Sequence, residues 1–234
     1  MNLRRAGGVP LVIGHRGAAA VAPENTLASL RAAVDAGAQL VEFDVGPDLR
    51  LAHSHGELPL EPLTLDGALE YLRDHDLGVH LDAKLPGYEE ALVEALRRHG
   101  VERRAVVSTA WAGSSRRLAR IAPTLPRAIG YPRDRYGISR VRWPRGLTAA
   151  GAAALRQAMP VRVPLLLRVA RADTLSLHHT LCSGAAIRIA HALGAPVLGW
   201  TANDPGTVRR LAALGVDAIV SDDPGMALAT LLEP

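Results

Sequence analysis

Acidic side chains that could act together on a charged substrate stand at the ends of two apolar runs. Glu42 and Asp44 flank Phe43 near the end of the run 38–45. Residues two apart in an extended strand point to the same side, so the two carboxylates share one face. Asp82, at the end of the next run, could supply a third oxygen ligand. Because a divalent cation relieves the repulsion between neighbouring carboxylates, we predict an all-oxygen site for Mg²⁺ or Ca²⁺.

Histidines and cations follow the same kind of run. His15 and Arg16 come directly after the first apolar run, and His53 follows a short extended piece. Two imidazoles near each other can exchange protons around neutral pH. Lys84 lies two residues beyond Asp82 and is the only lysine among the 27 Lys and Arg residues, which indicates a position that needs a compact ammonium group. Acids, imidazoles and cations together fit phosphoryl chemistry.

The elements that must position these residues alternate along the chain. Helical spacing follows most of the apolar runs, in the stretches 24–37, 64–75, 87–99, 112–122, 182–193, 204–214 and 223–232, with entry signals at Thr64, Asp204 and Asp223. The strand-like runs cover 9–14, 38–45, 77–83, 104–109, 126–130, 174–177, 196–201 and 216–221. This rhythm predicts a parallel α/β fold, a single (β/α)8 TIM barrel over residues 1–234, with a doubly wound open sheet as the alternative.

The segment 131–173 is less regular than the rest. Two helix-like pieces, 148–158 and 160–171, are joined through Pro160 with no clear strand between them, and we interpret the segment as one elaborated crossover.

In a parallel barrel the chemistry lies at the carboxyl ends of the strands, where the polar residues of this chain also gather.

Composition excludes several classes of protein. Hydrophobic residues make up 48% of the chain and charged residues 21%, which rules out intrinsic disorder. The net charge of +4 comes without a long basic run, and only 3% of residues are aromatic, so we expect no nucleic-acid partner. The single cysteine, Cys182, excludes a disulfide framework and a multi-cysteine zinc site. With no apolar run near about 18 residues and no signal peptide, we expect no transmembrane segment and a cytoplasmic protein.

Several short motifs together resemble the glycerophosphodiester phosphodiesterase family. They are HRG (15–17), PENT (23–26), EFD (42–44), LDAK (81–84), and WTANDP (200–205) followed by GVDAIVSDDP (215–224), and they cover nearly the whole chain in the family's order. HRG with PENT eight residues later is the most specific combination. The resemblance implies a (β/α)8 barrel that uses a divalent metal to hydrolyse small glycerophosphodiesters to sn-glycerol 3-phosphate and an alcohol.

The resemblance also implies a role for each matching residue. His15 and His53 would be the general acid/base pair, and Glu42, Asp44 and Asp82 would bind the metal. Arg16 and Lys84 would hold the phosphate, and Trp200 would line the pocket. Glu24 and Asn25 would support the loop after the first strand.

The chain departs from the family pattern at three points. The family usually has His-Asp where this chain has His53-Ser54, and His55 is an alternative to His53. The third metal ligand is commonly Glu, one methylene longer than Asp82. Only ten residues separate His53 from Thr64, so the usual family insertion is absent from this short form. A more open mouth would admit bulky leaving groups, so the alternatives are a lysophospholipase-D-like phosphodiesterase and a barrel that binds phosphodiesters without turnover.

Other polar residues have simpler expected roles. We expect His75, His99 and His191 on the surface, and His178 or His179 in a loop hydrogen bond. His80 shares a strand face with Asp82 and could either support it or pack in the core. Asp222 and Asp223 are expected to cap the last helix.

Overall fold

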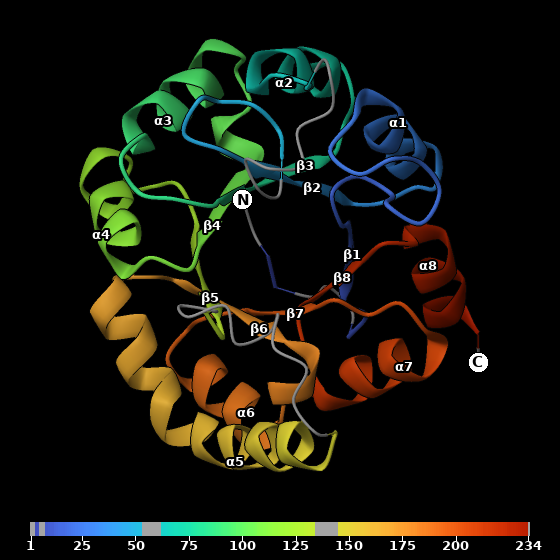
Figure 1. The fold of residues 1–234 in the computed structure, drawn as a ribbon, viewed down its shortest axis with the longest axis vertical. Coiled ribbons are helices and arrows are strands. Elements are labelled where there is room, and N and C mark those ends of the chain that lie inside the picture. The colour runs from blue at the N-terminus through green and yellow to red at the C-terminus, as the bar shows by residue number, and fades with distance from the viewer. Residues whose placement is uncertain (1–2, 5–7, 53–61, 134–144, 234) are drawn as a thin grey trace.

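The computed structural model describes residues 3–4, 8–52, 62–133 and 145–233, and its strands form a closed parallel barrel (Figure 1). The strands pair in chain order, and β1 pairs with β8 to close the barrel. Their bounds are β1 Leu11–Gly14, β2 Leu40–Val45, β3 Gly78–Ala83, β4 Ala105–Thr109, β5 Arg127–Tyr131, β6 Thr174–His178, β7 Val197–Trp200 and β8 Ala218–Ser221. The predicted (β/α)8 barrel is confirmed, and the open-sheet alternative is wrong. His53, Ser54 and His55 lie outside the described residues.

Helices surround the barrel and alternate with its strands (Figure 1). They are α1 Leu27–Asp35, α2 Leu65–Arg73, α3 Glu89–Arg98, α4 Ala112–Ile121, α5 Arg145–Ala170, α6 Gly184–Ala192, α7 Pro205–Leu214 and α8 Pro224–Leu232. The three predicted entry signals are N-caps: Thr64, Asp204 and Asp223 each accept a backbone N–H in the first turn of α2, α7 and α8. Among the described helices, none is both long and apolar enough to cross a bilayer.

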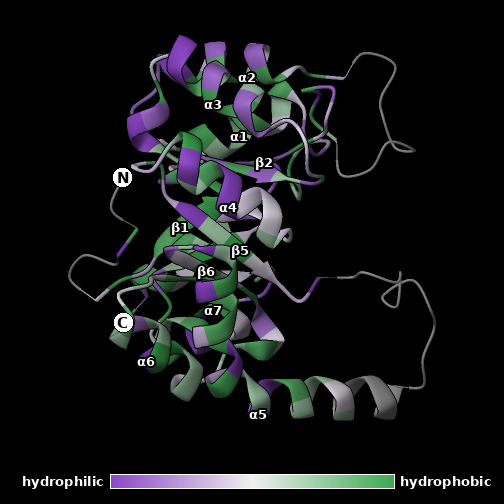
Figure 2. Ribbon diagram, turned by 90° about the vertical axis from the view of Figure 1, so that its left-hand side faces the viewer, coloured by the Kyte–Doolittle hydropathy of each residue, from purple (hydrophilic) through white to green (hydrophobic). Residues whose placement is uncertain are grey.

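Helix α5 differs from its prediction as two pieces. It is one helix of 26 residues that contains Pro160 and Pro164. Figure 2 labels this helix α5. Each proline removes a backbone donor, which normally weakens a helix interior. Met159, Val163 and Leu167 lie four residues apart on one face and are buried in the apolar cluster outside β5 and β6. This packing outweighs the local cost of the prolines, so the prediction of two helical pieces joined at Pro160 is wrong. The described part of the segment is a crossover helix between β5 and β6, in agreement with our interpretation.

Strand alternation sets which residues face the inside of the barrel. Phe43 is fully buried in the layer between the barrel and its helices, so its neighbours Glu42 and Asp44 point inward, as parity predicts. The β2–β3 register pairs Asp44 with Asp82, and the β3–β4 register pairs Asp82 with Ser108. Three neighbouring strands therefore present polar side chains at the same height.

Candidate active site

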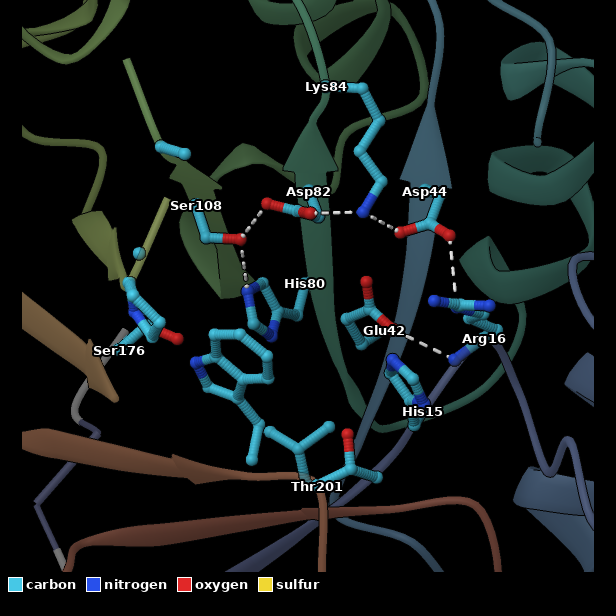
Figure 3. Close-up of a pocket in the computed structure, with 15 residues that line it drawn as sticks. His15, Arg16, Glu42, Asp44, His80, Asp82, Lys84, Ser108, Ser176 and Thr201 are labelled. Carbon is cyan, nitrogen blue, oxygen red and sulfur yellow. Dashed lines mark hydrogen bonds and ion pairs between the residues drawn. The ribbon is translucent and has the colours of Figure 1, made fainter. Parts of the chain in front are cut away.

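A cavity of about 230 Å³ opens at the carboxyl ends of the barrel strands (Figure 3). The predicted site residues within the described chain all line it, and they come from β1, β2, β3 and β7 or from the residues directly after these strands. The lining consists of His15, Arg16, Glu42, Asp44, His80, Asp82, Lys84, Ser108, Ala110, Gly130, Pro132, Ser176, Trp200, Thr201 and Val220. The fold therefore brings together residues that are far apart in the sequence.

The acidic triad, Glu42, Asp44 and Asp82, lies on one side of this cavity. One carboxylate oxygen of each residue lies within 4.8 Å of those of the other two. The Lys84 Nζ stands between two of the acids, 2.5 Å from Asp44 Oδ1 and 2.6 Å from Asp82 Oδ2 (Figure 3). Arg16 Nε lies 3.0 Å from the second oxygen of Asp44. Both predicted phosphate-binding cations thus contact the triad.

Charge in the triad is not fully compensated by the described residues. Burial and then the charge of Asp44 raise the pKa of Glu42 to about 7. Burial also acts to raise the pKa of Asp44, but the charges of Lys84 and Arg16 outweigh it and the pKa is lowered. Burial acts to lower the pKa of Lys84, but Asp82 and Asp44 raise it overall. Within the described chain no cationic side chain forms an ion pair with Glu42, which receives only the backbone N–H of Arg16 at 2.8 Å.

The donor chemistry of the triad fits a divalent cation. All three groups offer carboxylate oxygens close enough to share one ion, and the buried Glu42 carboxyl has no ion-pair partner among the described side chains. Hard cations such as Mg²⁺ and Ca²⁺ prefer oxygen ligands of this kind. Glu42, Asp44 and Asp82 could therefore hold such an ion.

His15 is held by a carboxylate from the opposite end of the chain. Its Nδ1 lies 2.5 Å from Asp222 Oδ1 across the β1–β8 junction. Asn203 fixes Asp222 in turn: its amide Nδ2 donates to Asp222 Oδ2 at 2.5 Å, and its Oδ1 accepts the Asp222 N–H at 3.0 Å. Burial alone would lower the pKa of His15, but the Asp222 hydrogen bond and the charge of Glu42 raise it overall. With Nδ1 engaged, Nε2 is the nitrogen left for proton exchange.

The predicted role of Asp222 as a helix cap is therefore wrong. Asp223 alone caps α8, through a hydrogen bond from the backbone N–H of Met226 at 2.9 Å. Asp222 directly follows β8 at the carboxyl end of the barrel, so its side chain reaches the cavity residue His15 instead. That position was the signal that could have identified it, and the WTANDP and SDDP motifs meet here through Asn203 and Asp222.

The HRG loop has a backbone that requires its glycine. Arg16 and Gly17 adopt positive φ angles of 49° and 85°. A Cβ at Gly17 would lie only 2.4 Å from the backbone carbon of Ser29, so a larger residue cannot fit. The Ser29 hydroxyl donates to the Arg16 carbonyl at 2.9 Å and belongs to the capping box with Thr26 at the start of α1. The loop is thus fastened to the first helix.

The PENT motif connects the HRG loop to the triad. Glu24 Oε2 accepts a hydrogen bond from Arg16 Nη1 at 2.6 Å, which supports the loop after β1 as expected. Asn25 reaches further than predicted, to β2: its Oδ1 accepts the Asp44 N–H at 3.0 Å, and its Nδ2 donates to Asp44 Oδ2 at 3.2 Å. Asn25 and Asp44 are both buried, at 4% and 1% exposure. The two hydrogen bonds therefore fix a buried carboxylate of the triad.

The other cavity wall is formed by β4 to β8 and carries no ionisable lining residue among those described. Trp200 lines this wall as predicted. Its ring forms a T-shaped contact with the His178 ring, with the two ring centres 5.1 Å apart. Outside the lining, Trp111 Nε1 donates to the Lys84 carbonyl at 3.0 Å, and the Arg133 guanidinium lies 3.4 Å from the centre of the Trp111 ring. The Trp111 ring is thus held next to Lys84.

The remaining histidines divide between cavity and scaffold. Burial lowers the pKa of His80 to about 4, and its Nε2 lies 2.9 Å from Ser108 Oγ. His75, His99 and His191 lie outside the cavity lining and are each hydrogen bonded, to Tyr71 O, Asp66 and Asp217 respectively. His178 forms the expected loop hydrogen bond, with Thr180 Oγ1 at 2.8 Å.

Comparison with known proteins agrees with this site. Residues 15–46 and 69–226 match the Glycerophosphoryl diester phosphodiesterase family. A glycerophosphodiester phosphodiesterase of Caldanaerobacter subterraneus subsp. tengcongensis is 25% identical over 92% of this chain and 94% of its own length.

Solved structures have the same fold. A putative glycerophosphoryl diester phosphodiesterase from Silicibacter pomeroyi superposes with a TM-score of 0.76 at 23% identity, covering 98% of this chain and 95% of that one. An Oleispira antarctica phosphodiesterase, in complex with the product sn-glycerol-3-phosphate, has a TM-score of 0.74 at 23% identity, covering 96% and 98%. The resemblance inferred from the motifs is confirmed: the chain belongs to the glycerophosphoryl diester phosphodiesterase family of enzymes.

Proposed function

We propose that this chain hydrolyses glycerophosphodiesters to sn-glycerol 3-phosphate and an alcohol with the help of a divalent cation. One observation carries the proposal: an acidic triad, two cations and His15, which Asp222 holds through Nδ1, line one wall of a single cavity or contact its lining. Family membership supports the same activity, and so does the product bound to the Oleispira antarctica relative.

The phosphate would bind beside Arg16 and Lys84. Attack at phosphorus increases the negative charge on the non-bridging oxygens, and both cations line the cavity where that charge would develop. A Mg²⁺ or Ca²⁺ ion held by Glu42, Asp44 and Asp82 would add Lewis-acid stabilisation of the same charge. Trp200 and the uncharged wall would then enclose the rest of the substrate.

Proton transfer would use two histidines. His15, oriented through Nδ1 by Asp222, presents Nε2 for one of the two transfers. His53 is the proposed partner, with His55 as the alternative. One histidine takes the proton of the attacking hydroxyl, from water or from the substrate's own glycerol, and the other protonates the departing alkoxide. Each transfer contributes about 10²- to 10⁴-fold in rate.

The proposal extends to the setting of the enzyme. Residues 1–234 would act as one catalytic domain in the cytoplasm, and the short connection after β2 would leave the mouth open to large alcohol groups. A lysophospholipid substrate is the second candidate, favoured by two apolar side chains next to Lys84: Trp111, which donates to the Lys84 carbonyl, and Leu85, which is 40% exposed.

An assay of glycerol 3-phosphate release tests the proposal. The full chain is incubated with glycerophosphocholine or lysophosphatidylcholine in Mg²⁺, in Ca²⁺ or in EDTA. Release from glycerophosphocholine with either metal, and none in EDTA, is the expected result. Release of lysophosphatidic acid alone would favour the second candidate. Intact ligand binding without turnover in any metal would show a binding protein and refute the enzymatic proposal.

A further inference from the structure

Two polar side chains in the cavity have no part in the chemistry proposed above. His80 on β3 is 3% exposed and Ser108 on β4 is 4% exposed, and both line the cavity close to Asp82. Polar groups this deeply buried are destabilising unless they are hydrogen bonded. His80 Nε2 lies 2.9 Å from Ser108 Oγ, which lies 2.7 Å from Asp82 Oδ1 (Figure 3). The two residues thus form a short chain that ends on the triad.

The direction of these hydrogen bonds follows from the number of protons. A serine hydroxyl has one proton, and a carboxylate can only accept, so Ser108 donates to Asp82. Ser108 Oγ must then accept the Nε2–H of His80. His80 Nδ1 is left without a hydrogen and, within the described chain, is buried without a partner. The hydrogen bonds from His80 to Ser108 and from Ser108 to Asp82 therefore require the neutral His80 tautomer that carries its proton on Nε2.

Asp82 is the most exposed member of the triad. Its side chain is 28% exposed, whereas that of Asp44 is 1% exposed and is already held by Asn25. Lys84 Nζ contacts Asp82 Oδ2, so Ser108 at Oδ1 supplies the second fixed point of the carboxylate. Two fixed points restrict rotation about the bond that carries the carboxylate. The strand register reinforces this arrangement because Asp82 pairs directly with Ser108 across β3 and β4.

We propose that His80 and Ser108 are positioning residues that orient Asp82 toward the rest of the triad and so strengthen its binding of a divalent cation. The inference rests on the metal site of the proposed function. Groups that hydrogen bond to metal ligands typically change metal affinity or activity by about 10- to 100-fold when they are removed. We expect an effect of that size on metal affinity, with a smaller effect on the affinity for substrate.

Two serines in the cavity provide a matched test. Ser108 and Ser176 are 4% and 5% exposed, and both line the cavity, but Ser176 has no hydrogen bond to the triad among the described residues. Mg²⁺ and Ca²⁺ are titrated by calorimetry into the full chain after removal of metal with EDTA. Ser108→Ala should weaken metal binding about 10- to 100-fold, whereas Ser176→Ala should leave it unchanged. Equal affinities in the two variants would overturn the proposal.

His80 is tested by a pair of substitutions that differ in one donor. His80→Gln keeps an N–H donor near the position of Nε2, and His80→Leu removes it. Metal affinity should be largely retained in His80→Gln and should fall in His80→Leu, while adding Ser108→Ala to His80→Leu should cause little further loss. Thermal unfolding checks that each variant folds. Equal losses with Gln and Leu would indicate a packing role and overturn the assignment of His80.

Metal binding and turnover separate this inference from the proposed function. A wild-type chain that binds Mg²⁺ and shows the expected order of variants, yet releases no glycerol 3-phosphate, would refute only the proposed activity. Turnover with a Ser108→Ala variant of normal metal affinity would refute only the positioning role. A wild-type chain that binds neither Mg²⁺ nor Ca²⁺ would overturn both the positioning role and the metal dependence of the proposed function.

Discussion

The cavity has two walls that differ in charge. Along β1 to β3 the described lining side chains are all ionisable, and three of them are held by neighbours: His15 by Asp222, Asp44 by Asn25, and Asp82 by Lys84. Along β4 to β8 the described lining residues are small or aromatic and carry no charge. This difference supports the proposal that the first wall would act on the phosphate and that the second wall would shape the space for the alcohol.

Substitution of His15 should have the largest effect on the charged wall. His15→Ala should reduce kcat/KM for glycerophosphocholine by roughly 10⁴-fold, because it removes the proposed proton-transfer group from the cavity. Circular dichroism should show an unchanged fold. His75 lies outside the cavity lining, so the His75→Ala variant is the control and should keep the activity of the wild type. Retained turnover in His15→Ala would contradict the assigned role.

Asp222→Asn should come next, with a loss of about 10³-fold in kcat, because it disturbs the proton transfer assigned to His15. The amide would donate to His15 Nδ1 and favour the tautomer that cannot accept a proton at Nε2. Since Asp222 helps to raise the pKa of His15, its removal should lower that pKa and move the corresponding limb of the pH–rate profile to lower pH.

The neighbouring Asp223 is the matched control for Asp222. Asp223→Ala should lower the free energy of unfolding by about 1 kcal/mol through loss of the α8 cap, with activity near that of the wild type. Urea unfolding and initial rates measure the two effects separately. If both aspartates affected activity equally, the specific contact between Asp222 and His15 would not explain the result.

Lys84→Arg tests whether the only lysine is needed for its shape. The compact ammonium fits between two carboxylate oxygens at 2.5 and 2.6 Å, and a planar guanidinium does not reproduce that contact. We expect kcat/KM to fall about 10²-fold, while Arg73→Lys on the exposed surface of α2 changes nothing. Activity at the wild-type level in Lys84→Arg would make the lone lysine a compositional accident.

The smallest effect should come from the uncharged wall. Trp200→Leu should raise KM about tenfold with little change in kcat, because the ring contributes binding that is equal in ground and transition states. Steady-state kinetics with glycerophosphocholine measure this split. A fall in kcat as large as that of Asp222→Asn would remove the distinction between the walls.

Sequence patterns predicted features that depend on local geometry. The inward direction of Glu42 and Asp44 followed from the alternation of a strand, and the strand ends followed from apolar runs. The contact between His15 and Asp222 was missed because it joins residues 207 positions apart, and it exists only once β1 pairs with β8. The continuity of α5 through Pro160 was also missed, because buried side chains on one face of the helix outweigh the local preference.

One measurement tests most directly whether the charged wall performs metal-dependent hydrolysis. Glycerol 3-phosphate release from glycerophosphocholine is followed in the wild-type chain and in Asp44→Asn, first after EDTA treatment and then during titration with Mg²⁺ or Ca²⁺. We predict no release after EDTA, recovery with added metal in the wild type, and little recovery in Asp44→Asn at the same metal concentration. Undiminished release in EDTA, or equal recovery in both proteins, would contradict the account.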